Sequence, residues 1–152
     1  MEKIASFTID HNVLLPGLYV SRKDTYNGNT VTTFDLRVTA PNREDVMSTG
    51  TIHTLEHLIA TYLRNSPLSP RVIYFGPMGC RTGFYLVTFG DMTSEEIFSY
   101  VKNAFEFVIA FEGEIPGAKP EECGNYSDQD LLGAKHFAIK YLAELQNKRF
   151  EY

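Results

Sequence analysis

The sequence predicts a single α+β domain, an α/β sandwich in which helices pack on one face of an antiparallel sheet. Two observations carry this prediction. The Asn27-Gly28 pair stands between two strand-like runs, which is a strong signal for a β-hairpin. Three later segments repeat apolar residues at three-and-four spacing, as helices with one buried side do. No repeat, low-complexity tract or linker interrupts the chain, so we expect one domain over residues 1–152.

Five strand-like runs are expected, at residues 4–9, 18–22, 30–39, 72–75 and 83–89. The first of them alternates only weakly and is expected at an edge of the sheet. In the third, the period-2 alternation places three apolar side chains on one face, those of Phe34, Leu36 and Val38. Asp35 and Arg37 share the opposite face. We expect the apolar set to face the core, so Arg37 should point away from it.

The first expected helix spans about residues 52–64 and follows two candidate caps, Ser48 and Thr49. It carries the most specific chemical signal of the chain, His53-Thr54-Leu55-Glu56-His57. Because positions four apart lie on the same face of a helix, both imidazoles can bind one metal ion. Glu56 lies beside this pair, within reach of an oxygen atom bound to the metal. A helix with two surface histidines and an unrelated glutamate is the alternative.

Two further helices are expected in the second half of the chain. Thr93 and Glu96 form a capping box, which predicts a helix that runs to about Glu112. Ser127 or Asp128 is expected to cap the last helix, which has a long apolar stripe.

A third metal ligand is required, because two histidines do not make a metal site. The candidates are two thiols, Cys80 and Cys123, and several carboxylates, those of Glu112, Glu114, Glu121 and Glu122. Cys123 lies in a loop punctuated by Pro and Gly, where no packing stripe demands an apolar residue. A His₂Cys set would leave the fourth position open, as catalytic sites do. A loop cysteine without a function fits the same pattern.

Cys80 lies in a Gly-rich turn between two strands, where its thiol could meet a substrate. A thiolate at this place could act as a nucleophile or as a proton-transfer base. A buried cysteine at a strand end is the alternative, and the residues alone do not decide between them. Ser6 and His11 near the start of the chain are not informative singly.

Composition limits the class of partner. The chain has 14 Lys and Arg against 19 Asp and Glu, a net charge of −5, and no long block of like charge, which argues against nucleic acid or anionic lipid as the main partner. No apolar run approaches the length of a membrane span. The first residues lack a charged-then-apolar leader, so we expect a cytoplasmic protein. Two cysteines are no disulfide framework, and we expect thiols.

Three separate motifs together closely resemble the S-ribosylhomocysteine lyase family, LuxS, which makes the precursor of the autoinducer-2 signal. They are His53-Thr54-Leu55-Glu56-His57-Leu58, Pro77-Met78-Gly79-Cys80-Arg81-Thr82-Gly83-Phe84 and Cys123-Gly124-Asn125-Tyr126. The resemblance extends from Ser6 to the last helix and covers nearly the whole chain. Two stretches depart from the common family pattern, residues 74–76 and 14–19.

The resemblance implies three groups of site residues. One divalent metal ion per chain, Fe²⁺ with Zn²⁺ or Co²⁺ able to replace it, would be bound by His53, His57 and Cys123, with water as the fourth ligand. The acid–base pair would be Glu56 and Cys80. The substrate pocket would be lined by Ser6, His11 and Arg37.

The resemblance also implies a reaction and an assembly. The reaction would cleave the thioether of S-ribosylhomocysteine, giving homocysteine and 4,5-dihydroxy-2,3-pentanedione, by metal-assisted carbonyl migration and β-elimination. The protein would be a homodimer with its two sites at the subunit interface. The whole chain, residues 1–152, would then be a single metal-dependent catalytic domain.

Two other readings remain open at the level of sequence. His-x-x-Glu-His is also the signature of inverted-zincin metallopeptidases, which would use a carboxylate as third ligand and give no task to either cysteine. A structural or metal-sensing module would use a closed Cys₂His₂ site that includes Cys80. An open coordination position would rule out the second of these.

Overall fold

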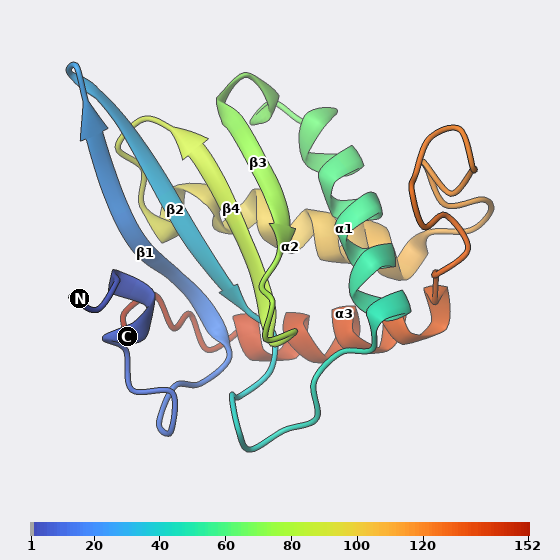
Figure 1. Cartoon of the computed structure of the whole chain (residues 1–152), viewed down its shortest axis with the longest axis horizontal. Helices are drawn as coiled ribbons and strands as arrows, with labels where there is room; N and C mark the ends of the chain where they lie inside the picture. Colours follow the sequence, from blue (N-terminus) through green and yellow to red (C-terminus); the bar gives the residue numbers. More distant parts are fainter. Residues whose placement is uncertain (1) are drawn as a thin grey trace.

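The computed structural model describes residues 2–152 and shows the expected α+β architecture (Figure 1). Within this range four strands form one antiparallel sheet in the order β1-β2-β4-β3. The strands are β1 (Gly17–Tyr26), β2 (Asn29–Arg37), β3 (Val72–Pro77) and β4 (Gly83–Phe89). The helices are α1 (Thr49–Arg64), α2 (Ser94–Ala110) and α3 (Leu131–Leu145), and two 3₁₀ turns are η1 (Ala5–Phe7) and η2 (Ser69–Arg71). All three α-helices cover the same face of the sheet.

The β1–β2 hairpin is confirmed. Its turn residues Asn27 and Gly28 have φ angles of 48° and 75°, the left-handed pair that a tight two-residue hairpin turn requires. The side chains that β2 presents to the helices, Phe34 and Leu36, are fully buried. The expectation that Arg37 points the other way is also confirmed, because it alternates with them along the strand.

The edge strand expected at residues 4–9 is wrong. The chain forms η1 there, closed by a hydrogen bond from the Phe7 amide to the Ile4 carbonyl of 2.9 Å. A strand needs a neighbouring strand to pair with and an apolar face that becomes buried, yet Phe7 stays 69% exposed. Asp10 then accepts hydrogen bonds from the backbone and side chain of Asn12, which stabilises a turn. The sheet therefore has four strands within the described range, not five.

The helix ends are mostly as expected. Ser48 caps α1 by accepting a hydrogen bond from the Thr51 amide, and the capping box of α2 is present. The expected cap of α3 is wrong, since Asp130 rather than Ser127 or Asp128 accepts the Gly133 amide at 2.9 Å. No helix in residues 2–152 combines the length and the apolar character needed to cross a membrane.

Candidate metal centre and substrate pocket

His53, His57 and Cys123 form a group of three ligand atoms that all lie within 4.8 Å of one another. The histidines are on successive turns of α1, and their ring centroids are 4.5 Å apart. Cys123 comes from the loop between α2 and α3, and its Sγ lies 3.4 Å from His53 Nε2. Cys80 is not a member of this group among the described residues.

Backbone carbonyls set the tautomer of both histidines. His53 Nδ1 donates to the carbonyl of Asp128 at 2.9 Å, and His57 Nδ1 donates to the carbonyl of Pro116 at 2.6 Å. Since a carbonyl can only accept, each Nδ1 carries the hydrogen and each Nε2 keeps its lone pair. This outer hydrogen bond is the usual support of a metal-binding histidine. Two imidazoles and one thiol are a donor set that suits Zn²⁺, Fe²⁺ or Co²⁺, so the residues fit a metal ion.

The loop that carries Cys123 is fastened to α1 through Asp130. The Thr51 hydroxyl donates to the Asp130 carboxylate at 2.9 Å, and the Asp130 amide donates to the Thr54 hydroxyl at 2.9 Å. Thr54 donates in turn to the side chain of Gln129 at 2.7 Å. Thr51 is two residues and Thr54 one residue away from His53 on the same helix. These bonds bring the loop back to the helix face that holds the histidines.

Gly117 lets this loop approach the metal group closely. Its φ is +75°, and a Cβ at this position would lie 2.9 Å from His57 Nδ1. Both the backbone conformation and the available space therefore favour glycine. The carbonyl that holds His57 belongs to the preceding residue, Pro116.

Glu56 lines the same open cavity as the three ligands, a space of about 580 Å³. Its side chain is half-buried on α1, and it has no hydrogen bond or ion pair with any other residue of the described chain. A carboxylate that is free of partners and faces a cavity can accept or return protons there.

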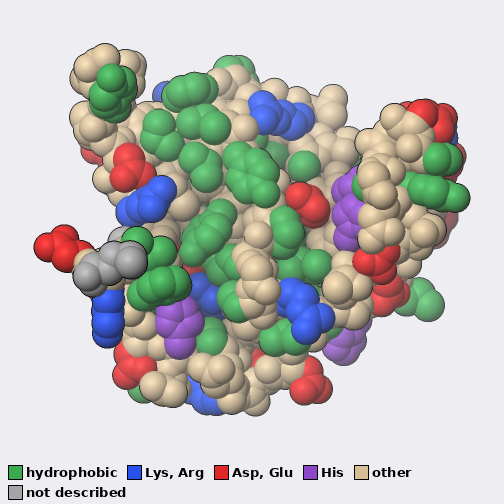
Figure 2. Space-filling view, in the orientation of Figure 1, with side chains coloured by type: hydrophobic (Ala, Val, Ile, Leu, Met, Phe, Trp, Pro, Cys, Tyr) green, Lys and Arg blue, Asp and Glu red, His purple; other side chains and the backbone are tan. Residues whose placement is uncertain are grey.

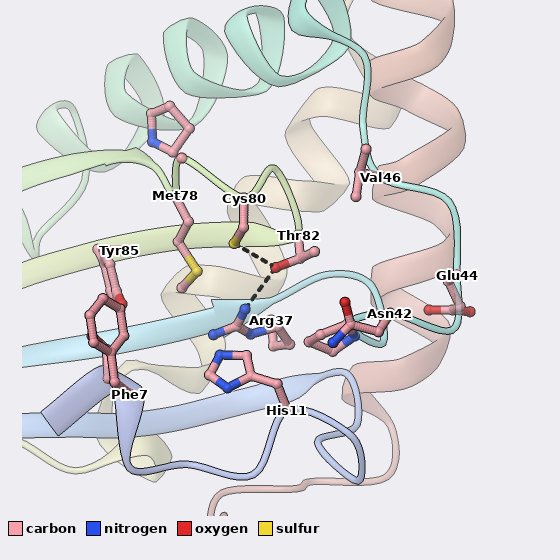
Figure 3. A pocket seen from close by; sticks show the side chains of 14 residues that line it. Phe7, His11, Arg37, Asn42, Glu44, Val46, Met78, Cys80, Thr82 and Tyr85 are labelled. Carbon is pink, nitrogen blue, oxygen red and sulfur yellow. Dashed lines mark hydrogen bonds between the residues drawn. The ribbon is translucent and has the colours of Figure 1, made fainter. Parts of the chain in front are cut away.

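A second cavity of about 520 Å³ brings together four residues of the expected site, Ser6, His11, Arg37 and Cys80 (Figure 3). Ser6 and His11 come from the N-terminal segment, Arg37 from the end of β2, and Cys80 from the turn between β3 and β4. Cys80 is exposed, as expected for a thiol that meets a substrate, and both cysteines are free.

A chain of hydrogen bonds joins Arg37 to Cys80. The Arg37 guanidinium donates to the Thr82 hydroxyl at 2.7 Å, and that hydroxyl lies 3.1 Å from Cys80 Sγ. Arg37 also pairs with Asp35, at 3.1 Å from Nε and 2.5 Å from Nη2. Burial raises the pKa of the Asp35 carboxyl, and the ion pair with Arg37 opposes that rise. Burial lowers the pKa of Arg37, but Asp35 more than offsets this and leaves it raised.

The two cavities are separate within one chain. They share no lining residue, so Glu56 and the three ligands lie in one, while Cys80 and Arg37 lie in the other. In Figure 1 the N-terminal segment and the loop after α2 are at opposite ends of the long axis. A single chain thus does not bring Glu56 and Cys80 into one cavity.

Sequence reasoning missed several residues of these sites. The close spacing of Asp35 and Arg37 on one strand face could have indicated the ion pair, since residues two apart point to the same side. Thr82 lies inside one of the three motifs and Gly117 lies in a loop, but neither residue by itself indicates a functional site. Tyr152, which donates to Asp35 at 3.0 Å, could not have been found, because their separation is 117 residues.

Comparison with known proteins gives a consistent result. The family model described as S-Ribosylhomocysteinase (LuxS) matches residues 4–151. The chain is 56% identical to an S-ribosylhomocysteine lyase of Finegoldia magna over 151 residues, 99% of this chain and 96% of the relative. It is 56% identical to one of Phocaeicola vulgatus over 146 residues, 95% and 91% of the two chains. A relative from Borreliella burgdorferi is 49% identical over 152 residues, 99% and 97% of the two chains.

Proposed function

Because the chain belongs to the S-ribosylhomocysteinase (LuxS) family, we propose that it is an S-ribosylhomocysteine lyase, with homocysteine and 4,5-dihydroxy-2,3-pentanedione as products. The observation that carries the proposal is the match of the family model to residues 4–151, together with the grouping of two imidazoles and a thiol beside a free carboxylate. The substrate is a small molecule, as the family implies. Residues 1–152 would be a single metal-dependent catalytic domain.

His53, His57 and Cys123 would hold one divalent metal ion per chain, and we propose Fe²⁺, with Zn²⁺ or Co²⁺ able to replace it. When bound, the ion supplies a Lewis acid that polarises the oxygens of the sugar. Three protein ligands leave the fourth position for water or substrate, which favours a catalytic over a closed structural site. Cys80 and the glutamates are not members of this ligand group in the described chain. The closed Cys₂His₂ module and the metallopeptidase with a carboxylate ligand therefore have no support here.

Glu56 and Cys80 would move the protons. In each carbonyl shift the carbon beside the carbonyl loses its hydrogen and the hydroxyl on that carbon loses its proton. The former carbonyl carbon gains one hydrogen and its oxygen gains one proton, so two hydrogens leave, two are returned and atoms are conserved. The shifts bring the carbonyl to a position two carbons away from the carbon that bears the thioether. Removal of one more proton, from the carbon between them, then allows elimination. The C–S bond breaks, a C=C bond forms, and the sulfur leaves as a thiolate that takes up a proton to give homocysteine.

Ser6, His11 and Arg37 would bind the substrate, and a second copy of the chain would complete each site. The separation of the two cavities supports this homodimer, because the acid–base pair is divided between them. The sheet face away from the helices also exposes apolar side chains, including Tyr74 at 51% and Phe89 at 55%. Figure 2 shows hydrophobic side chains gathered over the middle of this view of the molecule. Such a surface favours contact with another protein surface.

We further propose that the reaction takes place in the cytoplasm, where a reducing environment keeps both cysteines as thiols. The direct test of the function is release of free thiol from S-ribosylhomocysteine by the purified, metal-loaded protein. We expect catalytic turnover, with one thiol released for each substrate consumed. A protein that binds a metal ion at full stoichiometry and releases no thiol would contradict the proposal.

A further inference from the structure

The buried side chain of Asp35 holds Arg37 in place and does not itself line the substrate cavity. The Arg37 side chain is 3% exposed, and its guanidinium gives three hydrogen bonds, two to Asp35 and one to Thr82. An arginine has five N–H donors, so two of them remain for a ligand in the cavity. Which way these two point is decided by the bidentate pair with Asp35, because a planar guanidinium bound at two of its nitrogens cannot rotate freely.

Asp35 depends on a third donor. Its side chain is 2% exposed, and a buried carboxylate is costly unless its lone pairs are satisfied. Besides Arg37, the hydroxyl of Tyr152 donates to Asp35 Oδ2 at 3.0 Å. This is the same oxygen that accepts Arg37 Nη2. Burial raises the pKa of the Tyr152 hydroxyl, so the phenol stays protonated and donates.

The segment that carries Tyr152 is anchored across the start of β1. The carbonyl of Arg149 accepts a hydrogen bond from the Leu18 amide at 3.0 Å, and the Arg149 side chain donates to the carbonyl of Pro16 at 3.1 Å. The Tyr152 ring is stacked on that of Tyr19, with 4.6 Å between centroids and 19° between planes. The Tyr19 hydroxyl is bound elsewhere, to the carbonyl of Leu15 at 2.9 Å.

We propose that Tyr152 is a positioning residue for substrate binding, which fixes Asp35 and through it the guanidinium of Arg37, a residue that lines the cavity. The inference rests on the proposed function, in which Arg37 binds the substrate. Tyr152 and Asp35 do not line that cavity, so they act through Arg37 and not on the substrate itself. The last residue of the sequence thereby affects a site on the far end of β2.

Tyr152→Phe tests this with the loss of one oxygen atom, because the ring and its stacking on Tyr19 remain. We expect KM for S-ribosylhomocysteine to rise about tenfold with kcat within about twofold, since a hydrogen bond to a charged group is removed and Arg37 holds substrate and transition state alike. Tyr19→Phe is the matched control, because it removes a hydroxyl from the same stacked pair without a contact to Asp35. We expect its KM to stay within about twofold of the parent.

The route through Arg37 is tested by combining variants. In an Arg37→Lys background the bidentate pair is already lost, so adding Tyr152→Phe should change KM by less than about twofold. A separate readout needs no activity: the Nε–H proton of Arg37, assigned by its absence in Arg37→Lys, should exchange with solvent faster in Tyr152→Phe than in Tyr19→Phe.

Three results would overturn the inference: an unchanged KM in Tyr152→Phe, an equal rise in Tyr19→Phe, or full additivity with Arg37→Lys. Failure of the proposed function is distinguishable from these, because the parent protein itself would then release no thiol. In that case unchanged exchange of the Arg37 Nε–H in Tyr152→Phe would still reject the positioning role.

Discussion

His53 Nε2 and Cys123 Sγ lie 3.4 Å apart although 70 residues separate them in the chain. The contact exists because the loop before α3 returns to α1, where Thr51 and Thr54 bind Asp130. A nitrogen and a sulfur at this distance can share one ion, given metal bonds of about 2.0 Å to nitrogen and about 2.3 Å to sulfur.

Cys123→Ala removes one of three ligands and should strongly lower the metal content. A site with only two histidines binds divalent ions weakly, so we expect far less than one ion per chain after dialysis. Elemental analysis of the purified variant beside the parent checks this. Full stoichiometry in the variant would contradict the assignment of Cys123 as a ligand.

Cys80→Ala should behave in the opposite way. Because Cys80 lies in the second cavity and outside the ligand group, the variant should keep one metal ion per chain and lose homocysteine release. Metal analysis and a thiol-release assay on the same preparation measure both effects. Loss of the metal together with activity would favour a closed site that includes Cys80.

Glu56→Gln keeps the shape of the side chain and removes its ability to carry a proton. We expect metal content and substrate affinity close to those of the parent and a kcat lower by about 10²- to 10⁴-fold, the usual contribution of a general acid or base. Steady-state kinetics with metal analysis separate the two roles. Turnover near that of the parent would point to another acid–base group, with His11 as the first candidate.

Gly117→Ala should weaken metal binding through His57. The added Cβ would lie 2.9 Å from His57 Nδ1, so the ring or the loop has to move, and a disturbed outer support costs about 10- to 100-fold in metal affinity. Gly113→Ala is the matched control. Its φ is also positive, at +108°, but a Cβ there meets nothing within 4 Å.

The metal affinities of the two glycine variants are compared by competition with a chelator. The comparison is made where thermal melting shows the same folded fraction for both variants. Backbone strain alone would weaken metal binding in both to the same degree. Equal metal affinity in Gly117→Ala and the parent would show that the close approach to His57 has no effect on the ligand.

Mixed dimers test whether two chains complete one site. If Glu56 acts in one chain and Cys80 in its partner, a mixed dimer of Glu56→Gln and Cys80→Ala has one intact site and one doubly altered site. Random assembly of the two inactive variants by co-expression should then restore about a quarter of the parental activity, since half of the dimers are mixed and half of their sites are intact. Absence of restored activity, with mixed dimers verified by mass spectrometry, would mean that each chain supplies both groups to one site.

Local sequence determined most of the secondary structure and two of the three ligands of the metal group. Asn27-Gly28 specifies the hairpin turn by its preference for positive φ, and Thr93 with Glu96 specifies the start of α2. His53 and His57 are four apart on one helix, so their proximity is a property of helix geometry and is visible in the sequence. The weak alternation of residues 4–9 misled because a strand depends on a partner ladder, which local sequence does not encode.

Tertiary structure alone decided the contacts between distant segments. The residue that caps α3 is Asp130 rather than the predicted Ser127 or Asp128, because Asp130 is also the partner of Thr51 on α1. Tyr152 reaches Asp35 across 117 residues, and nothing local to either residue indicates it. The division of the acid–base pair between two cavities is likewise a matter of how the whole chain packs, because helix and strand periodicities fix which side chains share a face of one element and not which elements share a cavity.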